Sequence, residues 1–305
     1  MDLADLESLV RANRNDRDLR KLYTDCLVEK GDPRGEWASI CELLSIEAPL
    51  GGHRNGLSQD DLLKQKRALE ERHPEWWGEL VHERIDWIAG YFDHVELSSP
   101  GLLRPVLQLE SSRFLRSLAI DVAETFLPEV SDDLHARCDV LLELELRAKG
   151  RDLARMDLTM FSSLVSARLP LGDWTVTLPR SLRSLSVTGE GALSKNAATS
   201  LGNACRALPS LRSLTIDLGE TWRPIERGDL APILALATSG LTRLSLRRTT
   251  LCGEILRALA ALGPLSLVTL HLGGTFSGDD LRLARLPIFS QIEMDLRPTG
   301  THGSP

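Results

Sequence analysis

The sequence predicts an α/β fold in which an N-terminal helical cap domain precedes a solenoid of stacked repeats, with parallel strands on its concave face and helices on its convex face. Leu accounts for 59 of the 305 residues, whereas aromatic residues make up only 5% of the chain. Apolar residues recur at helical spacing over residues 2–90, and a six-residue frame, apolar-x-x-apolar-x-apolar, recurs over residues 92–296. We therefore expect a helical domain at 1–90, a repeat solenoid at 91–297 and a C-terminal tail at 298–305.

Short helices are expected throughout the first 90 residues. Asp16 and Ser58 are residue types that cap helix N-termini, because their side-chain oxygens accept hydrogen bonds from the first free amides. Pro33 and Pro74 fit the first helical position, where no amide hydrogen is needed. Gly31 is expected to end the second helix. The tryptophans here are expected to be core or interface residues and two cysteines to be core residues: Trp37, Trp76, Trp77, Trp87, Cys26 and Cys41.

The segment 22–37, with the sequence LYTDCLVEKGDPRGEW, resembles a small bacterial helical domain known as the repeat-companion domain. The usual form in that family is L-x-Y-A-D-W-L-x-E-x-G-D-P-x-G-E-F, and the domain is frequent in planctomycetes and myxobacteria. Further matches lie at 69–77 and 87–92. Thr24 and Cys26 stand where Ala and Trp are usual. The resemblance implies a domain that accompanies repeats, often leucine-rich ones, and that has no catalytic motif.

The six-residue frame is clear at six places, which begin at residues 115, 141, 182, 211, 241 and 267. Weaker frames begin at 92, 164 and 289. The frame at 164 divides the long gap between 141 and 182, but a competing frame at 153 leaves the register there open. Segments rich in Ala and Leu lie between frames at 197–208, 229–237 and 253–262, and we expect them to be helices.

This pattern is similar to that of leucine-rich repeats, in which each repeat has one short strand and a returning segment. One repeat cannot bury its apolar face alone, so the repeats are expected to stack around a shared core. Short helical returns resemble those of the ribonuclease-inhibitor-like class. The usual Asn or Cys after the strand is absent, so the repeats are degenerate. An all-helical solenoid is the alternative, and it would leave the recurring frames unexplained.

Charge and motifs argue against an enzyme, a nucleic-acid-binding protein and a membrane protein. The net charge is −7, and residues 1–90 contribute −6 of it. No P-loop, dinucleotide-binding glycine motif, H-E-x-x-H motif or nucleophile elbow occurs. The five cysteines are scattered without a C-x-x-C pair, which predicts neither disulfides nor zinc and favours a cytoplasmic protein. No catalytic, cofactor-binding or metal-binding residues are predicted, and no apolar run reaches the roughly 18 residues of a membrane span.

The x positions of the frame should face solvent on the concave sheet, and arginines and hydroxyls gather there in the later repeats. Such a surface suits an acidic protein, because guanidinium groups bind carboxylates well. An ordinary solvated sheet face is the alternative, since these positions are polar in any such array. The predicted partner-binding residues are Arg183, Ser186, Arg212, Thr215, Arg243, Ser245, Arg247 and His271.

The function predicted from these observations is a non-enzymatic protein–protein interaction module or scaffold of a bacterial cytoplasm. Its concave face would bind another protein, and the helical domain would cap the exposed end of the repeats. The alternative is a dedicated regulator, or a protease or kinase substrate, within a bacterial signalling or defence system. Neither the partner nor the oligomeric state follows from the sequence.

Overall fold

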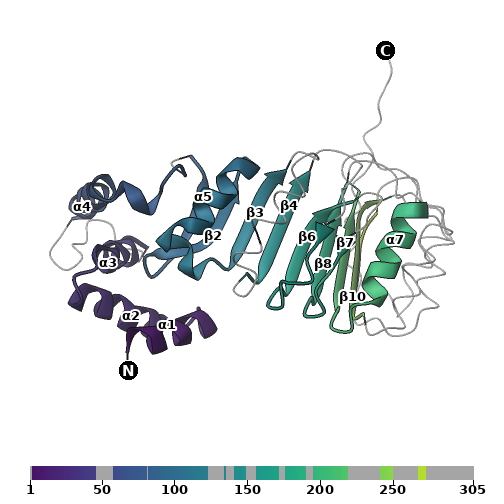
Figure 1. Cartoon of the computed structure of the whole chain (residues 1–305), viewed down its shortest axis with the longest axis horizontal. Helices are drawn as coiled ribbons and strands as arrows, with labels where there is room; N and C mark the ends of the chain where they lie inside the picture. Colours follow the sequence, from purple (N-terminus) through teal and green to yellow (C-terminus); the bar gives the residue numbers. More distant parts are fainter. Residues whose placement is uncertain are drawn as a thin grey trace, which may run out of the picture. The chain divides into compact units, whose positions relative to one another are not determined.

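The computed structural model shows an α/β chain in which N-terminal helices precede a mostly parallel sheet of short strands (Figure 1). The structure describes residues 2–45, 58–80, 82–122, 134, 141–148, 156–171, 176–189, 195–218, 241–249 and 267–272. The chain forms two compact units, Met1–Leu118 and Ala119–Pro305. The first unit therefore contains strands in addition to the helices expected at 1–90, and the expected tail at 298–305 lies outside the described residues.

The helices of the first unit are α1 (Leu3–Ala12), α2 (Arg17–Glu29), α3 (Pro33–Ser45), α4 (Gln59–Arg72) and the 3₁₀ helix η1 (Pro74–Trp76). The expected helix signals are confirmed. The Asp16 side chain accepts hydrogen bonds from two amides at the start of α2, and Ser58 forms a reciprocal capping box with Asp61. Gly31 has φ of +74°, which glycine adopts readily at a helix end.

Close contact between α2 and α3 explains a second glycine of the G-D-P-x-G-E segment. A Cβ atom at Gly35 would lie 2.7 Å from the backbone nitrogen of Val28 and 2.9 Å from the carbonyl oxygen of Thr24. Real Cβ atoms do not approach backbone atoms so closely, so a larger residue would push the two helices apart. Close packing of α2 against α3 therefore explains the glycine at position 35.

Two clusters of buried residues form the core of the first unit. Tyr23, Tyr91 and Phe114 lie together in one of them, with ring centroids 4.6 to 6.1 Å apart. Trp37 lies in the second cluster, where its ring centroid is 4.6 Å from that of Trp87. Trp37 and Trp76 are buried in the core, as expected, whereas Trp77, Trp87, Cys26 and Cys41 are only half-buried and pack against the two clusters.

The rest of the first unit comprises β1 (Arg84–Ile88), β2 (Tyr91–Leu97), η2 (Pro100–Leu102), α5 (Leu103–Gln108) and η3 (Glu110–Phe114). Strands β1 and β2 form an antiparallel hairpin that turns at Ala89 and Gly90, both with positive φ. The weak frame at residue 92 lies in β2 and is buried, but this strand runs antiparallel to β1.

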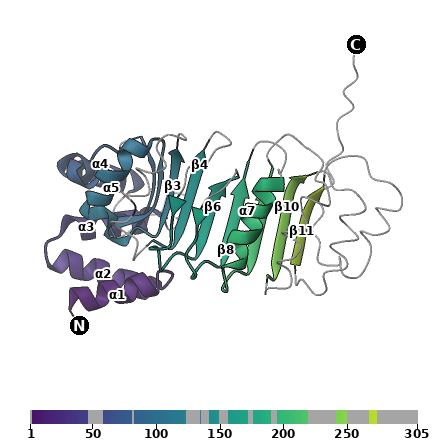
Figure 2. The same cartoon turned by 45° about the vertical axis from the view of Figure 1, so that its right-hand side comes forward.

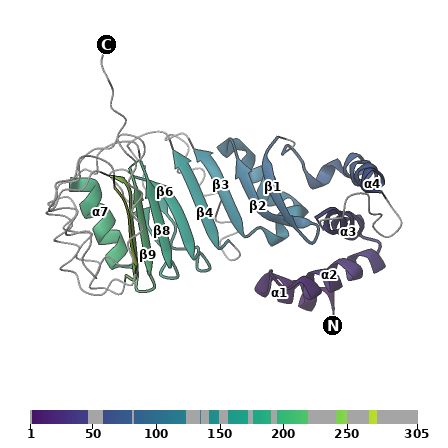
Figure 3. The ribbon, with the colours of Figure 1, turned by 180° about the vertical axis from the view of Figure 1, so that it is seen from behind.

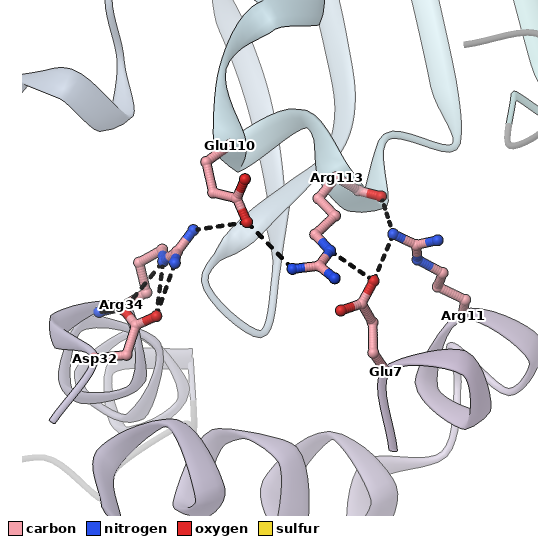
Figure 4. Close-up of polar contacts among 6 residues, drawn as sticks. All are labelled: Glu7, Arg11, Asp32, Arg34, Glu110 and Arg113. Atoms are coloured by element: carbon pink, nitrogen blue, oxygen red, sulfur yellow. Dashed lines mark hydrogen bonds and ion pairs between the residues drawn. The ribbon is translucent and has the colours of Figure 1, made fainter. Parts of the chain in front are cut away.

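Ion pairs connect α1 and α3 to η3 within the first unit (Figure 4). The buried Glu7 carboxylate forms ion pairs with Arg11 at 2.6 Å and with Arg113 at 2.8 Å. Arg113 also contacts Glu110 at 3.3 Å, and Glu110 lies 3.9 Å from a guanidinium nitrogen of Arg34. Each of these arginines thus has a carboxylate partner inside the unit.

The second unit contains a sheet whose strands follow one another in the order β3, β4, β6, β8, β9, β10 and β11 (Figure 3). These strands are β3 (Ser117–Val122, which crosses the boundary between the units), β4 (Glu143–Ala148), β6 (Ser166–Pro170), β8 (Ser184–Thr188), β9 (Ser213–Asp217), β10 (Arg243–Thr249) and β11 (Leu267–Leu272). Every pairing from β4 to β11 is parallel. A separate parallel pair consists of β5 (Met156–Asp157) and β7 (Val176–Thr177).

The strands coincide with the six clear frames, so the alternative of an all-helical solenoid is wrong. The structure also resolves the register between residues 141 and 182. The frame at 164 forms β6 in the main sheet, whereas the frame at 153 contributes β5 to the small sheet. The weak frame at 289 lies outside the described residues.

Burial along β8 shows why the frame repeats. Leu182, Leu185 and Val187 are fully buried, whereas Ser184 and Ser186 between them are half-buried on the opposite face. Helix α7 (Lys195–Arg206) follows β8 in the chain and lies beside the strands (Figure 2). Its residues Ala198, Leu201 and Cys205 are buried. The helices expected at 229–237 and 253–262 lie outside the described residues. No helix in the described part of the chain is long and apolar enough to cross a membrane.

Candidate partner-binding face

The polar face of strands β8, β9 and β10 is the candidate binding surface, and strand pairing arranges its side chains in rows. Because neighbouring strands lie about 5 Å apart, residues paired in register form continuous rows across the sheet. The row across the middle of the strands consists of Ser186, Thr215 and Ser245. The rows on either side are Ser184–Ser213–Arg243 and Thr188–Asp217–Arg247. The expected alignment of hydroxyls and arginines on these three strands is confirmed.

Arg183 and Arg212 lie at the starts of β8 and β9 and are exposed. The Arg183 carbonyl accepts the Arg212 amide at 2.9 Å, and the Arg212 carbonyl accepts the Thr242 amide at 2.9 Å. These two arginines therefore share a row with Thr242, and Arg243 lies in the next row. Arg183, Arg212 and Arg243 thus mark the N-terminal ends of adjacent strands, whereas Arg247, which is also exposed, lies further along β10.

The frame that begins at residue 267 predicts that His271 aligns with Ser245, and the pairing of β11 does not bear out this alignment. Strand β11 pairs with β10 so that Ser245 is opposite Thr269 and Leu246 is opposite Leu270. The sequence frame would have placed His271 opposite Ser245, two residues further along. A shift of two residues keeps every side chain on its own face of the sheet, so alternation in the sequence cannot distinguish the two registers.

Ser245 differs from its row neighbours in burial. It is only 4% exposed, whereas Ser186 and Thr215 are half-buried. Leu244 and Leu246 point into the core, so Ser245 lies on the polar face although solvent hardly reaches it. Its hydroxyl makes no hydrogen bond within the described part of the chain. A buried polar group without a partner is unusual and needs a physical explanation.

Charges on strands β3, β4 and β6 are paired with one another. Glu145 forms ion pairs with Arg147 at 2.8 Å and with Arg168 at 3.3 Å. Arg147 also forms an ion pair with Asp121 at 3.8 Å. Burial alone would raise the pKa of Glu145, but hydrogen bonds and charge from Arg147 and Arg168 outweigh burial and lower it. Glu145 thus belongs to an internal ion-pair ladder.

Comparisons with known proteins identified no relative. No protein-family model matches the sequence, and no curated protein or solved structure is significantly similar to it. The candidate site therefore stands on geometry and charge alone.

The chemistry of this face suits binding. Within residues 176–189, 195–218 and 241–247, Asp217 is the only acidic residue, and it is 8% exposed. No three His, Cys, Asp or Glu side chains of the described residues come together as a metal site. Burial raises the pKa of Cys205 to about 12, so this thiol stays protonated and is a poor nucleophile. The polar groups that remain on this face are guanidinium and hydroxyl groups, which bind anions and hydrogen-bonding partners.

Sequence reasoning left two residues out of the candidate site. Arg168 continues the middle row from Ser186 towards Glu145, and Asp217 lies beside Arg247. The weak frame at residue 164 could have placed Arg168, because it aligns this residue with Glu145 and Ser186. Asp217 directly follows the frame at 211, so extending each frame by one residue would have found it.

Proposed function

We propose that this chain is a non-enzymatic protein–protein interaction module. In this proposal a helical domain of the repeat-companion type precedes a degenerate leucine-rich array similar to the ribonuclease-inhibitor-like class. The partner binds on the concave face, through the polar face of β8, β9 and β10. The cytoplasmic location is part of the same proposal.

The observation that carries this proposal is the set of exposed arginines beside the hydroxyl rows of β8, β9 and β10. Arg183, Arg212, Arg243 and Arg247 are exposed there, and Asp217, the acidic residue within 184–188, 213–217 and 243–247, is buried. A fixed sheet that presents positive charge and hydroxyls favours an acidic protein surface, because charge complementarity speeds and orients binding.

Affinity capture from the source organism tests this proposal. The full chain is compared with a variant carrying Arg212→Glu and Arg243→Glu. A matched control carries Lys195→Glu and Arg206→Glu on α7, where both side chains are also exposed. The proposal expects the control to capture the same partner as the native chain and the sheet variant to lose it. Capture that survives in the sheet variant, or is lost equally in both, would overturn the proposal.

A further inference from the structure

Three side chains of β10 lie on one face at alternate positions. Arg243, Ser245 and Arg247 all point away from the core, because Leu244 and Leu246 between them are buried. On the neighbouring strand, Ser213 lies beside Arg243 and Thr215 lies beside Ser245. Ser213, Thr215, Arg243 and Ser245 therefore form a four-residue tile, which we call the β9–β10 tile.

The hydroxyl of Ser245 indicates that the β9–β10 tile is incomplete by itself. This side chain is more than nine-tenths buried, and its oxygen has no hydrogen-bond partner in the described part of the chain. Burial without a hydrogen bond is unfavourable for a hydroxyl, so a bound group that reaches this oxygen gains a hydrogen bond that the protein leaves open.

The charges around the tile determine what that bound group is. Arg243 is exposed and lies at the same end of the tile as Ser213. Asp217 is paired in register with Arg247, so a negative charge already lies at the far end of β10. An anion is therefore expected at the Arg243 end, where it is close to the guanidinium group and within reach of the Ser245 hydroxyl.

We infer that the β9–β10 tile binds a carboxylate side chain from an extended acidic segment of a partner protein. This inference rests on the proposed function and names the chemistry of the partner. A carboxylate has two oxygens, one for the Arg243 guanidinium and one for the Ser245 hydroxyl. The hydroxyls of Ser184 and Ser186 on β8 continue the two rows and are placed to bond the backbone of the same segment.

A nucleic acid fits this surface less well than an acidic peptide. Affinity for a polyphosphate backbone grows with the number of phosphates that lysines and arginines neutralise. The chain as a whole carries a net charge of −7, and the part of the chain that the structure describes places four exposed arginines, Arg183, Arg212, Arg243 and Arg247, along the polar face of β8 to β10. Hydroxyl rows with an arginine at one edge favour a few fixed carboxylates over a long polyanion.

Fluorescence anisotropy with synthetic peptides tests the inference on the full chain. The probe is a labelled dodecapeptide of alternating Glu and Ser, and the comparison peptide has Gln in place of Glu. The native chain should bind the Glu peptide at low salt, with affinity at least about tenfold higher than for the Gln peptide. Binding should weaken with added salt, because exposed charges are screened.

Two conservative variants test the tile itself. Arg243→Gln and Ser245→Ala should each weaken binding of the Glu peptide by about tenfold, because each removes a hydrogen bond to a charged group. Arg206→Gln on α7 removes the same charge elsewhere and should leave binding unchanged. Circular dichroism of each variant establishes that the fold is intact.

Three results would overturn the inference. They are a native chain that does not bind the Glu peptide, Glu-peptide binding that survives Arg243→Gln and Ser245→Ala, and tighter binding of a phosphoserine peptide that neither variant affects. None of these three results tests the proposed function. The proposed function is tested separately, by whether the variant with Arg212→Glu and Arg243→Glu loses capture of the native partner.

Discussion

The two compact units fill their cores with different side chains. Eight of the 14 aromatic residues of the chain lie within residues 1–118, and they meet in two clusters around Tyr23 and Trp37. The second unit instead repeats buried aliphatic positions from strand to strand, such as Leu185, Leu214 and Leu244, which are paired in register. The aromatic contacts of the first unit differ from one another, whereas the second unit repeats the same aliphatic contact between successive strands.

The two units also differ in where their charged side chains lie. In the first unit, Glu7, Arg11, Arg113 and Glu110 bind one another, so these charges stabilise the fold. In the second unit, Arg183, Arg212, Arg243 and Arg247 are exposed along the polar face. A chain of overall negative charge therefore presents exposed arginines along one polar face.

The largest effect is expected from truncating the centre of the aromatic core. Trp37→Ala should lower the free energy of unfolding by about 3–5 kcal/mol, and Leu214→Ala in the second unit by about 2–5 kcal/mol. Urea denaturation followed by circular dichroism measures both. Leu22→Ala is the control, because this side chain is 44% exposed and its loss should cost about 0.5 kcal/mol or less. A Trp37→Ala cost no larger than that of the control would contradict this description of the core.

A smaller effect is expected at the close contact of α2 and α3. Gly35→Ala should destabilise the chain by about 1–3 kcal/mol, because the new methyl group would overlap backbone atoms of α2. Gly101→Ala is a matched control, since its nearest neighbour would be the Ser99 hydroxyl at 3.7 Å. Equal thermal midpoints for the two variants would show that the helices do not constrain Gly35.

Much of this architecture could be predicted from local sequence. Helix starts follow from capping residues such as Asp16 and Ser58, because a cap needs only residues within one turn. The strands follow from the spacing of buried residues, and even the weak frame at 164 marks a real strand. The alignment of Ser186, Thr215 and Ser245 followed from the frames alone.

Other features depend on contacts that local sequence does not encode. Glu7 and Arg113 are 106 residues apart in the sequence, and no spacing rule connects them. The register of β11 moved His271 out of the middle row, because a slip of two residues preserves the alternation of faces. The burial of Ser245 likewise depends on what packs around it, since its sequence position is that of any exposed hydroxyl in the frame.

The smallest effect is expected from the ion-pair ladder of the second unit. The pKa of Glu145 is lowered in the folded chain, so its carboxylate stabilises the fold above its unfolded value near 4.5. This stabilisation is lost as the pH falls through the lower, folded pKa. Glu145→Gln should therefore cost about 0.5–1 kcal/mol at neutral pH and progressively less in acid. Urea denaturation at neutral pH and at about pH 3.5 measures the difference. A difference that is constant with pH would contradict the ladder.

The most direct test of the central claim measures stability and binding on the same sample. The variant with Arg212→Glu and Arg243→Glu is examined by thermal denaturation and by capture of the native partner. Both side chains are exposed, although Arg212 donates hydrogen bonds to the carbonyl oxygens of Pro209 and Leu211, so the thermal midpoint should fall by no more than a few degrees while capture of the partner is lost. Capture that persists in the folded variant would contradict the claim that the polar face of β8, β9 and β10 is a binding surface.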